Sequence, residues 1–381
     1  MPDVYILSMY KIITEGKTRF YVPVEGAFGK RVSGKDRKPP VFYNPYMALN
    51  RGICVLFMKT AGRGLVFADV LAGSGAKGLR VAAEAGNKIF LNDANKDAVE
   101  IIKKNAELNG LDVAVSNMDA NRFVLENRGL FDFIDIDPFG SPVPFIDSAL
   151  ISLKKTGYLG ITATDTATLC GVYPETCLRR YQAMPLRSEM CHEVGLRILL
   201  GYLARTAAKY DRGIRPILSH STRHYLRSYV EIKKRAKDGA ESLLSLGYLY
   251  YCEKCKDFSY EKELFPVERS CRCSAKMKVS GPLWLGGIHV HSLLTKMHTM
   301  AQTREEERLL KSLSEEVNVP FYFDIHVLAK AIKTTSTGLE TIIGKLKERG
   351  FTASKTHFSP VSIKTNAPVK VVKKTLISQE L

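Results

Sequence analysis

The sequence has no long hydrophobic run. None of its apolar stretches approaches the roughly 18 residues that a membrane-spanning helix needs, so we expect no membrane contact. The first residues, MPDVYILSMY, include Asp3 and lack the basic start and the cleavage pattern of a signal peptide. Internal repeats and long low-complexity segments are also lacking, and nothing indicates an obligate protein partner. We therefore expect a globular, intracellular protein of the cytoplasm.

Negative charge is scarce in this chain. Its 381 residues include 39 Asp and Glu against 56 Lys and Arg, which gives a net charge of +17. The positive excess is spread along the whole sequence and does not sit in one tail. A surface of this sign attracts polyanions through counterion release, so the charge favours a nucleic acid as partner over a surface that is only solvated.

Cysteine is also infrequent, and the eight cysteines divide into two sets. Four are scattered, and we interpret them as buried thiols: Cys54, Cys170, Cys177 and Cys191. The other four form two close pairs separated by 15 residues: Cys252, Cys255, Cys271 and Cys273. Two such pairs are typical of a structural zinc site with four thiolate ligands. The second pair is C-x-C where a common zinc ribbon has C-x-x-C, so free thiols or a disulfide remain alternatives.

Strands and helices are predicted to alternate after an N-terminal extension that contains two strand-like pieces, FYVPV and PVFYN. Near-continuous apolar runs predict strands at 66–72, 87–93, 113–119, 130–137 and 158–165. Amphipathic stretches predict helices directly after the first strand and at 94–110, 145–157 and 188–210. Residues 215–234 predict an antiparallel hairpin at the sheet edge. This pattern predicts an α/β fold with a Rossmann-like, doubly wound parallel sheet.

The character of the sequence changes near residue 240. The paired cysteines lie in a turn-rich stretch, and a helical region follows at 292–317. Residues 323–350 predict two helices, and two strand candidates come next, which is the order of a winged-helix module. We therefore predict a domain at 1–240 and a smaller α+β domain at 241–381. We expect the smaller domain to bind nucleic acid; the alternative is a packing domain that touches none.

The stretch DVLAGSGAKG lies between the first predicted strand and the first predicted helix. Gly73, Gly75 and Gly78 match G-x-G-x-x-G, a pattern that lets the backbone approach a nucleotide and aims helix N–H groups at it. The alternative is a helix start that only needs tight packing. The placement between a strand and a helix favours a cofactor site.

Three acids help to identify that cofactor: one lies inside the first predicted strand, and the other two end the second and third strands. Asp69 is placed to order the glycine turn and to orient a ligand ammonium, and Asp93 to bind ribose hydroxyls. Asp119 could meet an adenine amine together with the backbone N–H of Ala120. Acids suit a ligand with a sulfonium and an amine better than a pyrophosphate. The set therefore favours S-adenosylmethionine over a dinucleotide.

The fourth strand ends in DIDPFG. Asp137, Pro138, Phe139 and Gly140 resemble the D/N-P-P-Y/F tetrad of methyltransferases that act on exocyclic amines of nucleobases. Hydrogen bonds to the Asp137 carboxylate and the Pro138 carbonyl would localise the lone pair of such an amine, and Phe139 would stack on a flipped base. An ordinary Asx-Pro turn is the alternative. We expect Asp135 to point to the opposite face and to be structural.

Several separated blocks together resemble one family, the tRNA guanine-N2 dimethyltransferases, which methylate guanosine 26. These blocks are VFYNPYMALNRG, DVLAGSGAKGLR, IDIDPFGSPVPF, TATDTATLCG and GPLWLGGIH. The resemblance implies S-adenosylmethionine as methyl donor, two methyl transfers and tRNA as partner. It also implies Arg37 and Arg63 as cofactor contacts and suggests that Asp165 lines the base pocket. A DNA amino-methyltransferase and a non-catalytic binding protein are the remaining alternatives.

Overall fold

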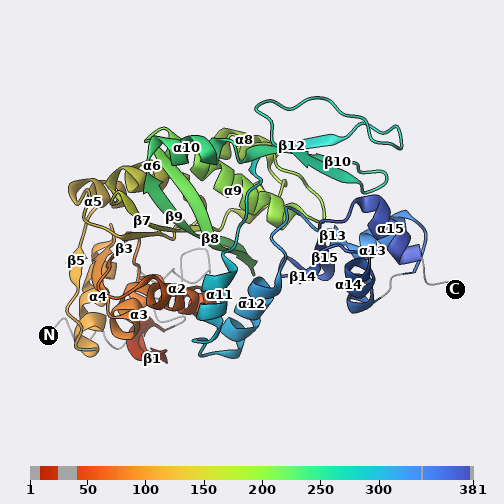
Figure 1. Cartoon of the computed structure of the whole chain (residues 1–381). Helices are drawn as coiled ribbons and strands as arrows, with labels where there is room; N and C mark the ends of the chain where they lie inside the picture. The colour runs from red at the N-terminus through yellow and green to blue at the C-terminus, as the bar shows by residue number, and fades with distance from the viewer. Residues whose placement is uncertain (1–8, 25–40, 336–337, 378–381) are drawn as a thin grey trace, which may run out of the picture. The chain divides into compact units, whose positions relative to one another are not determined.

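The structure is a computed structural model that describes residues 9–24, 41–335 and 338–377 (Figure 1). Its backbone packs into two compact units. The first unit comprises 1–137, 148–160 and 296–307, and the second comprises 138–147, 161–295 and 308–381. This division does not test the predicted domain boundary at residue 240, which stays a prediction. Among the described residues, no helix is long and apolar enough to cross a membrane.

The central sheet has seven strands in the order β5-β4-β3-β6-β7-β9-β8. They are β3 (Val66–Asp69), β4 (Lys88–Asn92), β5 (Ala114–Ser116), β6 (Phe133–Ile136), β7 (Thr156–Ala163), β8 (Arg212–Thr222) and β9 (Tyr225–Lys234). Strand β3 pairs in parallel with β4 and with β6, and β4 pairs in parallel with β5. Strands β8 and β9 form an antiparallel hairpin at one edge. The predicted sheet and its edge hairpin are confirmed. The order reverses at β3, where open α/β sheets bind their ligands.

Helices lie between these strands and directly after β9, and the four that were predicted begin close to their predicted positions. The helices are α3 (Ala76–Ala85), α4 (Lys96–Leu108), α5 (Ala120–Glu126), α6 (Val143–Ser152), α7 (Thr166–Leu169), α8 (Pro174–Tyr181), α9 (Cys191–Ala208) and α10 (Ala236–Leu243). Asn95 caps the start of helix α4, because its side chain accepts the N–H of Asp97. After the end of the helix, the chain turns at Gly110 with φ +61°. The sequence analysis did not predict α5, α7, α8 or α10.

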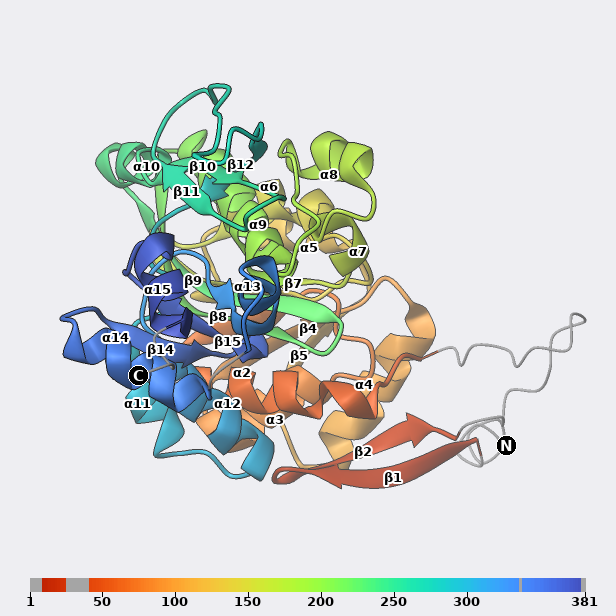
Figure 2. The same ribbon diagram turned by 90° about the vertical axis from the view of Figure 1, so that its right-hand side faces the viewer.

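The N-terminal segment begins with a hairpin of β1 (Tyr10–Glu15) and β2 (Thr18–Pro23), which lies against α3 and α4 (Figure 2). Glu15 joins this hairpin to the neighbouring helices. Its carboxylate accepts from Arg51 Nη2 at 2.6 Å and from Arg80 Nη1 at 2.8 Å. The second strand-like piece, PVFYN, was wrongly predicted as a strand. There Asn44 instead caps a 3-10 turn, η1 (Pro45–Met47), which leads into α2 (Ala48–Ala61).

The C-terminal part adds two small antiparallel sheets in the second unit. One has the order β11-β10-β12, from β10 (Leu246–Tyr251), β11 (Phe258–Glu261) and β12 (Lys278–Trp284). The other has the order β13-β15-β14, from β13 (Phe323–Asp324), β14 (Ala353–Thr356) and β15 (Ser359–Thr365). The predicted helical region at 292–317 consists of two helices, α11 (His291–His298) and α12 (Arg304–Glu315).

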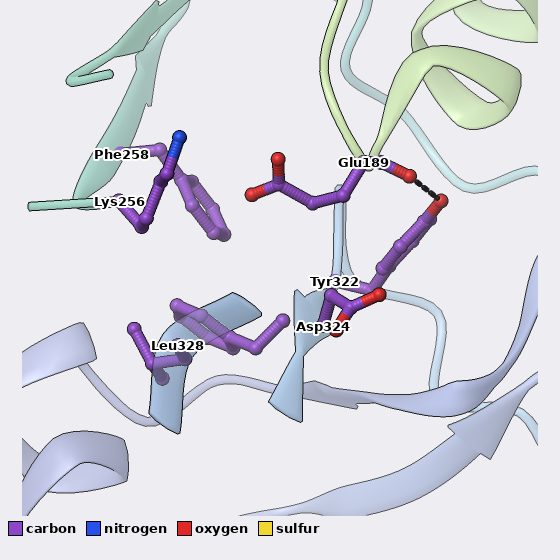
Figure 3. Close-up of a pocket in the computed structure, with 7 residues that line it drawn as sticks. Glu189, Lys256, Phe258, Tyr322, Asp324 and Leu328 are labelled. Atoms are coloured by element: carbon purple, nitrogen blue, oxygen red, sulfur yellow. Dashed lines mark hydrogen bonds between the residues drawn. The ribbon is translucent and has the colours of Figure 1, made fainter. Parts of the chain in front are cut away.

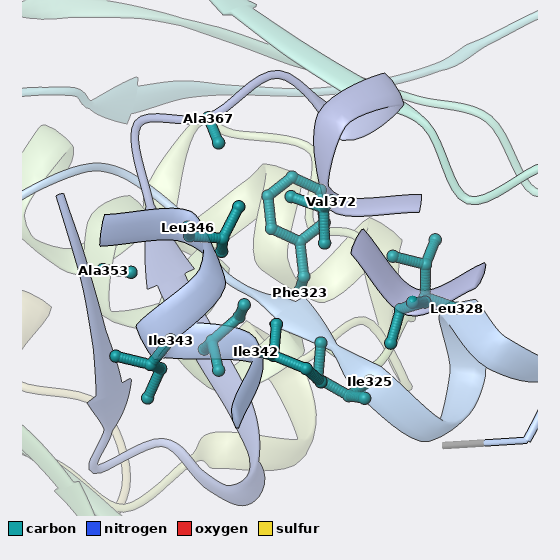
Figure 4. Packing of buried hydrophobic residues seen from close by; sticks show 11 residues of the cluster. Phe323, Ile325, Leu328, Ile342, Ile343, Leu346, Ala353, Ala367 and Val372 are labelled. Carbon is teal, nitrogen blue, oxygen red and sulfur yellow. The ribbon is translucent and has the colours of Figure 1, made fainter. Parts of the chain in front are cut away.

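Three helices pack on the last sheet: α13 (Ile325–Ala331), α14 (Leu339–Glu348) and α15 (Val369–Ile377). Their apolar side chains meet in one core, in which Phe323, Ile342, Leu346 and Val372 are buried (Figure 4). The order α13, α14, β14, β15 is the predicted order of a winged-helix module. Strand β13 and helix α15 are additions that the sequence analysis did not predict.

Candidate active site

The glycine turn after β3 has the geometry that its sequence predicts. Gly73 and Gly75 have φ of +55° and +77°, a region that favours glycine. Gly78 is required for packing, because a Cβ there would lie 2.3 Å from Leu91 Cδ2 of β4. The turn therefore brings α3 close to the sheet and directs its first N–H groups to the carboxyl edge.

Asp93 lies at the end of β4 and contacts this turn. Its Oδ2 accepts the N–H of Gly73 at 2.8 Å, and its Oδ1 accepts the N–H of Asn95 at 2.9 Å. A carboxylate oxygen has two lone pairs, so each retains capacity for a ligand hydroxyl. The predicted ribose contact is thus held in a fixed orientation by backbone groups.

Asn92 joins the loops that follow three neighbouring strands, and the sequence analysis missed it. The side chain is fully buried, and its Nδ2 donates to the carbonyls of Val70 at 3.1 Å and Met118 at 3.0 Å. Its Oδ1 accepts the N–H of Met118 at 3.1 Å. A polar residue that ends an apolar strand, directly before Asp93, was the available signal.

Asp119 and Ala120 open helix α5. The Oδ1 of Asp119 accepts the N–H groups of Asn121 and Arg122, both at 3.0 Å, so this carboxylate caps the helix. Ala120 is the first residue of α5, and a first-turn N–H has no partner within its own helix. The two residues therefore present one carboxylate oxygen and one N–H at the edge where the adenine contact was predicted.

Lys77, in the first turn of α3, binds two acids of the fourth strand. Its Nζ donates to Asp137 Oδ2 at 2.5 Å and also to Asp135. The expectation that Asp135 and Asp137 face opposite sides is wrong, because residues two apart in a strand share a face. The side chain of Asp135 is fully buried, that of Asp137 is partly exposed, and the single ammonium contacts both carboxylates.

Asp69 is the last residue of β3 and pairs with Asp135 of β6 in the sheet. Only 2% of its surface is exposed. Burial raises the pKa of Asp69 to about 7, an effect that the nearby Lys77 opposes and that Asp135 and Asp137 strengthen. Near neutral pH the carboxyl group is therefore partly protonated. The glycine turn thus follows an acid whose charge depends on pH near neutrality.

In the second unit, the loop after Asp137 is fixed to the end of β7. Gly140, at φ +86°, donates its N–H to Thr164 Oγ1 at 2.6 Å, and its carbonyl accepts the N–H of Thr164 at 2.9 Å. Pro138 is buried, whereas Phe139 is 77% exposed. An exposed ring held by a rigid loop is suited to stacking on a base.

Asp165 is part of a hydrogen-bond chain that reaches the same loop. The hydroxyl of Tyr181 donates to Asp165 Oδ1 at 2.7 Å, and Ser141 Oγ donates to the Tyr181 oxygen at 2.8 Å. Arg180 contacts the other carboxylate oxygen of Asp165 at 3.3 Å. Burial is the main cause that raises the pKa of Tyr181, so this phenol stays protonated. The sequence analysis missed Tyr181, because only the fold brings it to Ser141.

The structure does not support the other two predicted cofactor contacts in the same way as Asp93. Arg37 lies outside the described residues. Arg63 is exposed in the segment before β3, and its neighbour Gly64 donates to the carbonyl of Gly86, just before β4. Arg63 therefore lies at the amino ends of these strands, whereas the glycine turn lies at their carboxyl ends.

The paired cysteines come together in the second unit. Cys252 and Cys273 have sulfurs 3.5 Å apart, Cys255 and Cys271 have sulfurs 3.4 Å apart, and all four lie within 4.8 Å of one another. Four converging thiols of this kind fit a tetrahedral metal ion, for which a Zn–S bond of about 2.3 Å requires similar separations. Hydrogen bonds from a backbone N–H lower the pKa of Cys273 to about 7.

Two hollows elsewhere in the second unit do not suit a nucleobase. One has a volume of about 10 Å³, room for about one water molecule, and Tyr322 beside it donates to the carbonyl of Glu189 (Figure 3). The other, of about 300 Å³, is lined by charged side chains that pair with one another, such as Arg215 with Glu231 at 2.7 Å. Neither hollow is lined by residues of the loop at 138–141, which is the candidate acceptor site.

The fold defines a class: a Rossmann-like methyltransferase, in which a glycine turn follows β3, an acid follows β4 and the stretch 137–140 follows β6. Comparisons with known proteins agree. Residues 17–377 match the family model for N2,N2-dimethylguanosine tRNA methyltransferase. The chain therefore belongs to this family of tRNA methyltransferases.

Individual relatives match nearly the full length. The tRNA (guanine(26)-N(2))-dimethyltransferase of Pyrococcus horikoshii is 39% identical over 96% of this chain and 97% of its own. The enzyme of the same name from Pyrococcus furiosus is 43% identical over 94% of this chain and 96% of its own. The solved structure of Trm1 from P. horikoshii with S-adenosyl-L-methionine has a TM-score of 0.87 and 38% identity, and covers 96% of this chain and 99% of that one.

Proposed function

We propose that this protein transfers methyl groups from S-adenosylmethionine to the exocyclic N2 amine of guanosine 26 in tRNA, twice in succession. The observation that carries the proposal is the near-complete match to Trm1 in complex with that cofactor, at a TM-score of 0.87. The net charge of +17 supports an RNA partner. Because its substrate is tRNA, we place its activity in the cytoplasm, with no obligate protein partner.

The residues at the carboxyl edge of the first unit fit the cofactor. Asp93 would accept the ribose hydroxyls, and the N–H of Ala120 with the second oxygen of Asp119 would meet the adenine. The backbone at Gly73 and Gly75 leaves room for the amino-acid part, and Asp69 would lie toward its ammonium. When bound, the cofactor supplies an electrophilic methyl group. Arg63 has no part in this assignment.

The acceptor side consists of Asp137 and the loop that follows it. The carboxylate and the Pro138 carbonyl would accept the two N–H bonds of the guanine amine, while Phe139 stacks on the extruded base. As the nitrogen gains a methyl group it becomes cationic and strongly acidic. The Asp137 carboxylate would accept that proton. Lys77, which donates to Asp137 Oδ2, holds the carboxylate in place.

We also propose one structural zinc ion at Cys252, Cys255, Cys271 and Cys273. Four thiolates complete a tetrahedral shell, so this ion would have no open position for a substrate. The C-x-C spacing of the second pair does not prevent convergence of the sulfurs, which lie within 4.8 Å of one another. The ion would join the turn between β10 and β11 to the segment between β11 and β12.

The test is methyl transfer from labelled S-adenosylmethionine to unmodified tRNA, with mass spectrometry of the nucleosides. We expect N2-methylguanosine and N2,N2-dimethylguanosine, both lost when guanosine 26 is replaced. Duplex DNA is the control acceptor, since a DNA amino-methyltransferase uses a similar tetrad. Incorporation into DNA alone, or at another tRNA position, would contradict the proposal.

A further inference from the structure

A second group of metal-binding side chains lies in the second unit. Cys170 follows the last residue of α7, and Cys191 and His192 are the first two residues of α9. Their donor atoms all lie within 4.8 Å of one another, and the Cys170 sulfur is 3.6 Å from His192 Nδ1. The sequence analysis placed Cys170 and Cys191 among the scattered thiols, because 21 positions separate them.

The spacing of these donors is that of ligands around one ion. For zinc bonds of about 2.3 Å to sulfur and 2.0–2.1 Å to nitrogen, tetrahedral geometry puts the two ligand atoms about 3.5 Å apart. The observed 3.6 Å between Cys170 Sγ and His192 Nδ1 agrees. Cys170 is buried, whereas Cys191 and His192 are half-buried, so a fourth ligand can be water. Thiolate and imidazole donors favour zinc over hard cations.

A third group of possible metal ligands is not suited to a metal ion. It consists of His289, Glu316 and His357. There the Nζ of Lys364 lies 3.0 Å from Glu316 Oε1, and His357 Nδ1 lies 2.7 Å from Glu316 Oε2. The lysine ammonium already neutralises the carboxylate and would repel a metal ion. That cluster is a buried ion network, and it carries no metal site.

We propose that Cys170, Cys191 and His192 bind a zinc ion, separate from the four-cysteine cluster and from the methyl-transfer site. The ion would join the end of α7 to the start of α9. Helix α7 directly follows Asp165, so the ion would fix the segment behind the loop at 138–141. This last consequence rests on the proposed function, whereas the metal site itself does not.

The test is the zinc content of the purified full-length chain, measured by inductively coupled plasma mass spectrometry, together with Co²⁺ absorption. The double variant Cys170→Ser/Cys191→Ser should hold one zinc fewer per chain than the wild type. The matched control is Cys177→Ser, a buried thiol outside the group, which should keep the wild-type content. An unchanged zinc content in the double variant would overturn the proposal.

Two further measurements keep the result interpretable if the double variant does not fold. His192→Asn changes a half-buried side chain and should weaken zinc binding at least tenfold with an unchanged circular dichroism spectrum. Tryptic mapping without reductant separates peptides 156–179 and 188–197. A disulfide between Cys170 and Cys191 in the protein as purified would overturn the metal site in favour of a redox pair. Zinc content does not depend on methyl transfer, so failure of the proposed function would be seen separately.

Discussion

At the scale of single residues, Lys77 supplies the positive charge at the end of β6. Its ammonium contacts both Asp135 and Asp137, and its side chain is almost fully buried. A buried cation between two carboxylates is costly to remove, because the remaining charges lose their compensation. The sequence shows only a lysine in a glycine turn. Its role follows from the fold, which brings the first turn of α3 to Asp135 and Asp137, and no local pattern shows this.

Replacement of Lys77 by methionine should destabilise the fold by about 3–5 kcal/mol, since it leaves two acids unbalanced. Lys77→Arg keeps the charge and should lose much less. Chemical denaturation with urea measures both. If the methionine variant is as stable as the arginine variant, the ion pairs do not contribute as described.

Asp137→Ala should reduce methyl transfer at least 100-fold, the lower range for loss of a proton acceptor, and leave the affinity for S-adenosylmethionine nearly unchanged. Single-turnover assays and calorimetry separate the two effects. Asp147→Ala is the control, because Asp147 is a half-exposed acid that binds Lys209 at 2.9 Å. Retained turnover in the Asp137 variant would remove Asp137 from its assigned role.

Asp69 makes folding stability depend on pH. Its pKa is raised to about 7 by burial, so the folded state binds more protons than the unfolded state between about pH 4 and 7. The contribution of Asp69 to stability therefore falls as pH rises through this window. Asp69→Asn should be more stabilising relative to wild type at pH 8 than at pH 4.5. Thermal unfolding at both pH values checks this; an equal difference at the two values would contradict it.

At the scale of elements, α3 depends on close contact with β4. A Cβ at Gly78 would lie 2.3 Å from Leu91 Cδ2, so Gly78→Ala should push the helix outward and cost about 1–3 kcal/mol. Affinity for S-adenosylmethionine should fall with it, because the glycine turn moves. Gly344→Ala in α14 is the control, since no atom lies within 4 Å of a Cβ there, and it should be neutral or stabilising. Equal effects of the two variants would contradict this account.

Elements differ in how well the sequence predicts them. The strands of the sheet were predictable because buried parallel strands are near-continuous apolar runs. Helix α2 was not, because all residues from Leu49 to Met58 are buried and no polar stripe reveals its period. Candidate site residues could be named from the sequence where one strand end supplies them, as at Asp93 and Asp137, and their roles stay predictions. Residues were missed where a contact joins distant segments, as at Tyr181.

At the scale of the whole molecule, the charge of +17 predicts salt-dependent tRNA binding. Residues 324–381 hold 10 Lys and Arg against 4 Asp and Glu, so the last module should contribute. If about six phosphates are contacted, affinity should fall roughly 10³-fold between 50 and 200 mM salt. Lys347→Glu, at an exposed position of α14, should lower the slope of this dependence.

Filter binding across a salt series measures this effect. The affinity for S-adenosylmethionine is the internal control, because a small ligand with a low net charge releases few counterions and should change little. Binding of tRNA that is insensitive to salt would contradict an interface dominated by phosphates.

The contacts that hold Asp137 and the loop at 138–141 have a consequence for two successive methyl transfers. A second methyl on the same nitrogen requires a second molecule of cofactor, so the donor must be exchanged once per finished nucleoside. Asp137 is held by Lys77, and Gly140 is held by Thr164; both contacts are made by the protein itself. Under the proposed function, these contacts would stay in place while the donor is exchanged, which would allow both transfers within one encounter with tRNA.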